Sequence, residues 1–216
     1  MRSFRSLHNL VIVAGYALGA ALYSRLPEEI EPTWTVADRG TVWSGAFMVA
    51  FLLPTAAAVT DGLLRSLYVR HPLDESASAT VLATYDAIML RFILFVMGVH
   101  ATLLAGVVGM LQGRAWAVQV VPVMLGLTMI SVGNLLPRTR PNLAIGIRTP
   151  RTLSDRAFWV RTHRMAGYTV VSLGFVIVLA AIAVPPPIGS GMILLVGPIG
   201  AVGMGCFMWY SKHARS

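Results

Sequence analysis

Charged residues are scarce in this sequence. Only 12% of its 216 residues are Asp, Glu, Lys or Arg, whereas 56% are hydrophobic. A soluble domain carries about 25% charged residues, so this chain has too little polar surface to cover a soluble globule. Acidic residues are the scarcest, nine against seventeen basic ones, and the net charge is +8. The composition predicts an integral membrane protein.

Cysteine is also nearly absent, because Cys206 is the single one in the chain. One cysteine excludes an intramolecular disulfide, and the five scattered histidines have no spacing that predicts a metal site. The sequence contains neither an evident carboxylate pair nor a plausible Ser-His-Asp set for hydrolysis. We therefore expect a protein that is not an enzyme and that holds no metal and no cofactor.

Six apolar segments are each about 20 residues long, the length at which an α-helix crosses a bilayer. The fifth and sixth are separated by the triplet Pro185 to Pro187, which cannot continue a helix. We predict an all-α integral membrane protein of six transmembrane helices, folded as one domain over residues 1–216. The predicted spans lie near residues 8–24, 41–60, 87–111, 115–137, 165–184 and 188–210.

Lys and Arg are distributed unequally between the two sides of these spans. With a cytoplasmic N-terminus, thirteen of the seventeen lie on the inside and three on the outside, and Arg91 lies within the third span. This is the positive-inside pattern, so both termini of this multi-pass protein should be cytoplasmic. Four of the nine acidic residues fall in the first external loop, namely Glu28, Glu29, Glu31 and Asp38.

Two kinds of residue within the spans bear on packing and function. Gly15 and Gly19 form a GxxxG pair that predicts close helix packing, with a dimer seam as the alternative. Arg91 is expected to snorkel outward and pair structurally, or else to make a functional contact. His100 is expected to be a neutral histidine bonded to another helix, with proton relay as the alternative. No Asp or Glu lies in the middle of a span, which argues against a proton-coupled transporter.

The most basic part of the chain is the stretch from Gly133 to Gly167, which holds seven arginines and one acidic residue, Asp155. We call it the Arg-rich loop. Charge gathered beside apolar spans is typical of a cytoplasmic flank that faces anionic lipid, so membrane lipids are expected partners and direct nucleic-acid binding is not. Seven arginines are more than are needed to orient the chain in the membrane. Guanidinium groups form strong hydrogen bonds with phosphates and carboxylates.

Prolines and a glycine also interrupt the loop at several positions, which favours an ordered structure. Its prolines and Gly146 predict turns in the first half. The stretch from Asp155 to Arg164 is predicted to form an interfacial helix, with Thr152 or Ser154 as its N-cap. On that helix Phe158, Trp159 and Thr162 should face lipid or other helices, and the arginine heads should lie in water.

The stretch carries a long pattern of fixed spacing, "GN-LP-TR-N---GIRTP-TLS----W--THR-AG", from Gly133 to Gly167. This pattern resembles the SdpI family of bacterial membrane proteins, typified by the immunity protein against a sporulation-delay toxin peptide. The SdpI-like region spans residues 87–210, and residues 1–60 resemble a small N-terminal module often fused ahead of it. The matching positions form a candidate binding site: Asn134, Pro137, Arg140, Asn142, Gly146, Arg148, Thr149, Pro150, Thr152, Trp159, Thr162, His163 and Arg164.

The resemblance implies six spans, cytoplasmic termini and residence in the bacterial plasma membrane. It also implies a function in protecting the cell from a membrane-active antimicrobial peptide. It also implies a second role, in which toxin engagement lets the protein hold a cytoplasmic transcriptional repressor at the membrane. Two alternatives stay open. The protein could be a small transporter or a lipid-headgroup-binding protein that uses the same arginines, or an envelope-stability protein with no ligand.

Overall fold

In the computed structural model, residues 2–27, 45–70, 78–114, 116–142 and 145–184 are described. They contain five helices long and apolar enough to cross a membrane, and no strand is found among these ranges. A short helix α5 (Pro150–Ser154) and 3-10 turns at Tyr23–Arg25 and Leu136–Arg138 complete them. The long helices are α1 (Arg2–Leu22), α2 (Gly45–Arg70), α3 (Ser78–Val107), α4 (Ala117–Gly133) and α6 (Arg156–Ala183).

The all-α fold is confirmed, and the first five predicted spans are present as helices. The sixth prediction, residues 188–210, and the acidic loop residues from Glu28 to Asp38 lie outside the described residues. The stretch predicted as an interfacial helix is helical, but it is continuous with the fifth span in the single helix α6.

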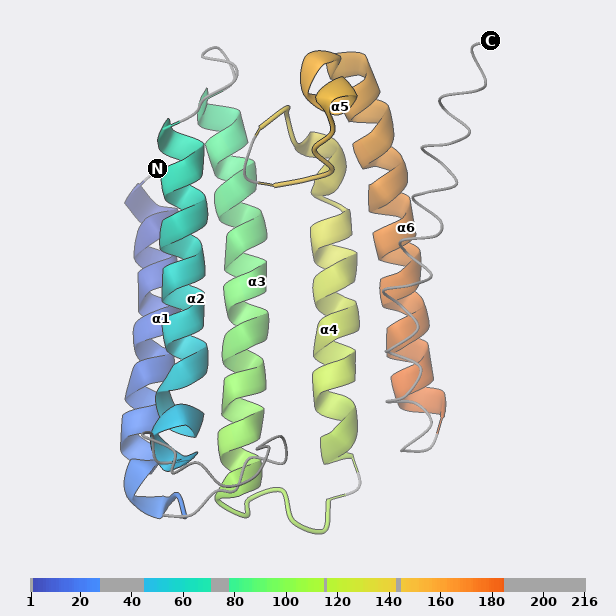
Figure 1. The fold of residues 1–216 in the computed structure, drawn as a ribbon. Helices are drawn as coiled ribbons and strands as arrows, with labels where there is room; N and C mark the ends of the chain where they lie inside the picture. The colour runs from blue at the N-terminus through green and yellow to red at the C-terminus, as the bar shows by residue number, and fades with distance from the viewer. Residues whose placement is uncertain (1, 28–44, 71–77, 115, 143–144, 185–216) are drawn as a thin grey trace, which may run out of the picture.

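The long helices lie side by side and alternate in direction (Figure 1). Helices α1, α2 and α3 pack against one another, α3 also contacts α4, and α4 pairs with α6. Because the direction alternates, the start of α1 and the segment that contains α5 lie at the same end of the molecule (Figure 1). We call this the loop end.

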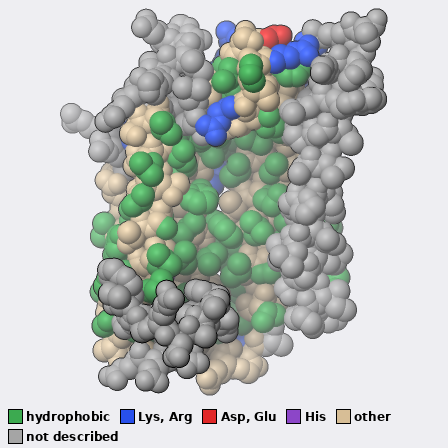
Figure 2. All heavy atoms as spheres, in the orientation of Figure 1, with side chains coloured by type: hydrophobic (Ala, Val, Ile, Leu, Met, Phe, Trp, Pro, Cys, Tyr) green, Lys and Arg blue, Asp and Glu red, His purple; other side chains and the backbone are tan. Residues whose placement is uncertain are grey.

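The outward faces of the helices are apolar along their length. Leu10, Leu63, Leu179 and Ile182 each keep more than 60% of their surface exposed. Hydrophobic side chains cover the middle of the molecule, whereas Lys and Arg atoms gather toward the loop end (Figure 2). A soluble monomer rarely exposes apolar surface on this scale, so the long helices match the environment of a bilayer.

Glycines set the closest helix contacts. A Cβ atom added to Gly126 or Gly174 would lie 2.7 Å from the carbonyl oxygen of the other residue, so α4 and α6 approach backbone to backbone. A side chain at Gly19 would collide with the carbonyl oxygen of Ala50, and one at Gly15 with Met97. The GxxxG pair of α1 therefore serves packing within the chain, as small residues do in membranes.

Candidate functional site

The Arg-rich loop is folded back onto the first turns of α6. The indole Nε1 of Trp159 donates to the backbone carbonyl of Thr139 at 3.1 Å, and Trp159 is fully buried. The rings of Trp159 and His163 are stacked, with their centroids 3.9 Å apart. One helical turn therefore offers the loop both a hydrogen-bond donor and a flat aromatic surface.

His163 holds the second contact between loop and helix. Its Nε2 accepts the backbone N–H of Ile147 at 3.0 Å, and its Nδ1 lies 2.9 Å from the carbonyl oxygen of Trp159. These partners require a neutral ring with its hydrogen on Nδ1. Gly146 makes the approach possible, because its φ of +114° favours glycine and a Cβ there would collide with His163 Nε2.

The Thr-Pro-x-Thr stretch builds α5 as a small capped unit. Thr149 is the N-cap, its hydroxyl accepts the N–H of Thr152 at 3.2 Å, and Pro150 takes the first helical position. The buried hydroxyl of Thr152 donates to the carbonyl oxygen of Ile147 at 2.8 Å. Helix α5 is therefore bonded to Ile147, the same loop residue that His163 contacts.

The predicted N-cap of the following helix was wrong. Asp155, not Thr152 or Ser154, caps α6, because its carboxylate accepts the N–H of Phe158 at 3.0 Å. Asp155 has an extended backbone between two helices, which is the conformation an N-cap needs. Thr152 is instead used inside α5.

A side chain also forms the turn that enters this unit. The amide of Asn142 donates to the carbonyl of Arg140 at 2.7 Å, and its oxygen accepts the N–H of Ile145 at 2.7 Å. Asn142 is therefore a turn residue that satisfies backbone groups with no neighbouring helix to bond them.

The pattern residues divide into two groups by exposure. Five polar or aromatic members are buried, namely Asn142, Thr152, Trp159, Thr162 and His163. Among the loop arginines Arg140 is partly buried, whereas these six are exposed: Arg138, Arg148, Arg151, Arg156, Arg161 and Arg164. The first group holds the loop in shape, and the second carries its charge to the surface of the loop end.

The remaining pattern residues lie where α4 meets the loop. Asn134 is exposed and bonds the carbonyl of Ile130 in its own helix at 2.9 Å. Pro137 lies within the Leu136–Arg138 turn and packs beside Gly167, where a Cβ would lie 3.2 Å from the proline ring. The hydroxyl of Thr162 is buried and has no hydrogen-bond partner within the described ranges.

The two intramembrane candidates, Arg91 and His100, lie apart from the loop contacts. The guanidinium of Arg91 donates from Nε to the hydroxyl of Ser131 on α4 at 2.5 Å and from Nη1 to the carbonyl of Ala87 at 2.6 Å. His100 is fully buried, and its Nε2 lies 3.3 Å from the carbonyl oxygen of Gly15 on α1. Each therefore joins two helices, and for His100 the contact corresponds to the expected bond to another helix.

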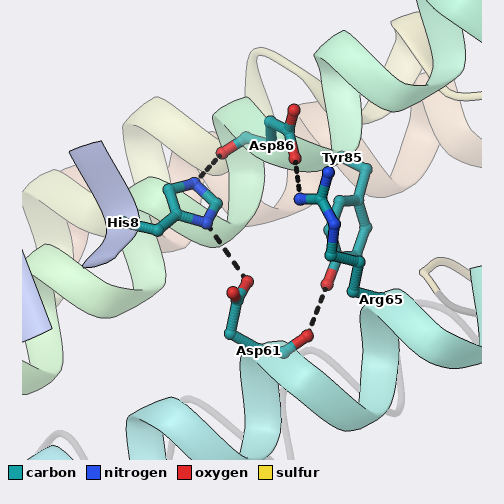
Figure 3. Close-up of polar contacts among 5 residues, drawn as sticks. All are labelled: His8, Asp61, Arg65, Tyr85 and Asp86. Atoms are coloured by element: carbon teal, nitrogen blue, oxygen red, sulfur yellow. Dashed lines mark hydrogen bonds and ion pairs between the residues drawn. The ribbon is translucent and has the colours of Figure 1, made fainter. Parts of the chain in front are cut away.

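A second polar site was missed by reasoning from the sequence (Figure 3). At the loop end, His8 of α1 is fully buried between α2 and α3. Its Nδ1 lies 3.2 Å from Asp61 Oδ1, and its Nε2 lies 3.0 Å from the carbonyl oxygen of Asp86. Arg65 donates to Asp86 Oδ1 at 3.1 Å, and the hydroxyl of Tyr85 donates to the carbonyl of Asp61 at 3.3 Å.

A signal for this cluster was present in the sequence. Asp61 and Asp86 flank the loop-side ends of two predicted spans, and His8 begins the first predicted span. The positive-inside count puts these three ends on one side of the membrane, where scarce ionisable groups tend to pair. The exact partners depend on helix rotation, which the apolar windows do not define.

Residues 138–211 match the model of the SdpI/YfhL protein family. Over 168 residues the chain is 24% identical to the immunity protein SdpI of Bacillus subtilis (strain 168). The aligned region covers 78% of this chain and 76% of that protein. No solved structure matches. The resemblance to the SdpI family is thereby confirmed, and its match begins in the Arg-rich loop.

Proposed function

From its similarity to the SdpI family, we propose that this chain is a membrane immunity protein that protects a bacterial cell from a membrane-active peptide. The curated relative is named as an immunity protein and is similar along most of both chains. In this proposal the Arg-rich loop is the contact surface for an anionic partner at the cytoplasmic face, and a transcriptional repressor is one such partner.

The observation that carries the proposal is that buried side chains hold the Arg-rich loop in one ordered conformation. Trp159, His163 and Thr152 are all completely buried and use their polar atoms to hold the loop backbone. A loop needed only for topology would require positive charge but no such framework. A fixed framework presents guanidinium groups in a defined arrangement, which favours recognition of a specific anionic surface.

Lipid-headgroup binding is a second candidate, and the exposure of the arginines favours it. Arg156, Arg161 and Arg164 lie in the first turns of a membrane-length helix, close to where headgroups would be. Each basic residue near an anionic leaflet contributes about 1 kcal/mol of attraction. In this reading the loop would hold a phosphate at the cytoplasmic face.

The proposal is tested by survival. The full-length protein is expressed in a peptide-sensitive bacterium that lacks its own immunity proteins, and the cells are challenged with a sporulation-delay-type toxin. Wild-type protein should preserve viability and membrane potential, and the Arg148→Ala, Arg164→Ala double variant should lose most of that protection at equal expression. Arg114→Ala is the matched control, because Arg114 is exposed in the turn after α3, at the opposite end of the helices.

The outcomes separate the two candidates. Protection that the double variant loses and Arg114→Ala keeps would support immunity through the Arg-rich loop. Protection that survives in the double variant would refute the role of these arginines. If wild type gives no protection, but the purified protein binds vesicles of anionic lipid and the double variant does not, lipid binding is the better account.

A further inference from the structure

Both ring nitrogens of His8 face hydrogen-bond acceptors (Figure 3). Nε2 faces the carbonyl oxygen of Asp86 at 3.0 Å, and Nδ1 faces Oδ1 of Asp61 at 3.2 Å. The His8 side chain has no exposed surface, so bulk water cannot stand between it and either oxygen. Both distances are within the range of N–H···O hydrogen bonds.

A neutral imidazole cannot satisfy this arrangement, because it carries one N–H and one bare nitrogen. A carbonyl oxygen and an ionised carboxylate both only accept, so with either tautomer one ring nitrogen would direct its lone pair at an acceptor oxygen. One additional proton, on the ring or on the carboxyl group of Asp61, lets Nε2 donate to the carbonyl of Asp86 while a hydrogen bond joins Nδ1 and Asp61. His163 differs, because one of its partners is a donor and the other an acceptor.

The charges around His8 lead to the same conclusion. The ionisable groups that face it are Asp61 and Arg65 from α2 and Tyr85 and Asp86 from α3. Arg65 pairs with Asp86, and among the side chains that the structure describes no Lys or Arg forms an ion pair with Asp61, so the carboxylate of Asp61 needs a bound proton to balance its charge. An uncompensated charge at membrane depth is costly, and one proton brings the cluster to neutrality.

We infer that His8 and Asp61 form a proton-binding site at the loop end of the helices, with a single proton shared between imidazole and carboxylate. This inference does not rest on the proposed function. The site is not sealed, since the side chains of Asp61 and Arg65 keep 12% and 22% of their surface exposed. A proton can therefore enter from the loop end.

The proton site also touches the Arg-rich loop. Tyr85 donates its hydroxyl hydrogen to the carbonyl of Asp61, and its ring forms a buried apolar cluster with Met89 against which Leu64 and Ile145 pack. Ile145 belongs to the loop. Loss of the proton would remove a hydrogen bond between α1 and α2 at Asp61, the residue that Tyr85 bonds, so the packing is retained at lower pH and weakened as the pH rises.

Nitrogen NMR of histidine rings tests the inference. The full-length protein is labelled with ¹⁵N in its histidine rings and placed in lipid nanodiscs. The substitutions His71→Gln and His213→Gln leave three histidines, namely His8, His100 and His163. The spectrum is recorded at about pH 7.5, where a solvent-exposed histidine is mostly neutral. We expect neutral rings for His100 and His163, and for His8 either two protonated nitrogens or a neutral ring beside a protonated Asp61 carboxyl seen by infrared spectroscopy.

Asp61→Asn is the diagnostic variant, because the asparagine amide can donate to Nδ1 and removes the need for the extra proton. The signal of the protonated pair should then be lost, and His8 should become neutral with its hydrogen on Nε2. A neutral His8 in wild type together with an ionised Asp61 would overturn the inference. That result needs no variant at the cluster, so it remains decisive even if Asp61→Asn fails to fold.

Discussion

The backbone N–H of Ile147 donates to Nε2 of His163, which is 3.0 Å away and sixteen residues later in the chain. A side chain of a membrane helix thus accepts a hydrogen bond from the middle of the loop that precedes it. The bond makes His163 a structural acceptor, which requires its neutral form. His8, at the same end of the molecule, faces acceptors on both sides, so the pair that it forms with Asp61 requires one additional proton.

Gly146 is expected to be required for docking of the loop. An alanine there would place Cβ against His163 at a positive φ, which should cost about 1–3 kcal/mol. Gly146→Ala should lower the melting temperature in detergent and speed trypsin cleavage at Arg148 and Arg151. Gly62→Ala is the control, because a Cβ at Gly62 meets nothing within 4 Å; equal cleavage rates for the two variants would contradict the docked loop.

Trp159 should contribute through its indole N–H as well as its area. Trp159→Phe keeps an aromatic ring but leaves the carbonyl of Thr139 without its donor. The loss of a buried hydrogen-bond partner costs about 1–3 kcal/mol, measured as the free energy of unfolding in an SDS titration. Trp116→Phe offers a matched comparison, since Trp116 is half exposed; if both variants lose the same stability, the Thr139 bond has no net value.

The helices were predictable because their signal is local. An apolar run of about 20 residues is enough to identify a span, and the first five predictions correspond to α1, α2, α3, α4 and α6. The boundaries were less predictable where polar residues continue a helix beyond its apolar run. Helix α3 begins at Ser78, nine residues before the predicted span, because packing of Tyr85 and Asp86 against α1 and α2 extends it.

The site was predictable in its location but not in its internal contacts. The spacing of arginines, prolines and glycines identified an ordered loop. The N-cap of α6 could not be chosen, because Thr152, Ser154 and Asp155 all have an oxygen that can cap and only the path of the backbone distinguishes them. The roles of His163 and His8 depend on groups that only the folded chain brings close.

The contact between α4 and α6 should tolerate no side chain at its glycines. A Cβ at Gly174 would lie 2.7 Å from the carbonyl oxygen of Gly126, and backbone cannot rotate away. Gly174→Ala should therefore destabilise the protein by about 1–3 kcal/mol, as overpacking does. At Gly98 the obstacle is the flexible end of Met124, so Gly98→Ala should cost less. An equal or reversed order of unfolding free energies would argue against backbone contact between these helices.

Arg91 and Ser131 should be energetically coupled across the seam between α3 and α4. The Nε–Oγ hydrogen bond of 2.5 Å joins them, and a bond of this kind within a membrane contributes about 0.5–2 kcal/mol. A double-mutant cycle with Arg91→Met, which keeps an apolar stem, and Ser131→Ala isolates this value from the loss of packing.

The control cycle pairs Arg91→Met with Thr102→Val, whose hydroxyl bonds the carbonyl of Gly98 in its own helix at 2.8 Å. Thr102 is eleven residues from Arg91 on α3, about 16 Å along the helix, so these two changes should add independently. Coupling in the first cycle but not in the second would make Arg91 a link between α3 and α4. Additive losses in both would mean that Arg91 contributes only through its stem and its surface-directed charge, and that the two helices are held together without it.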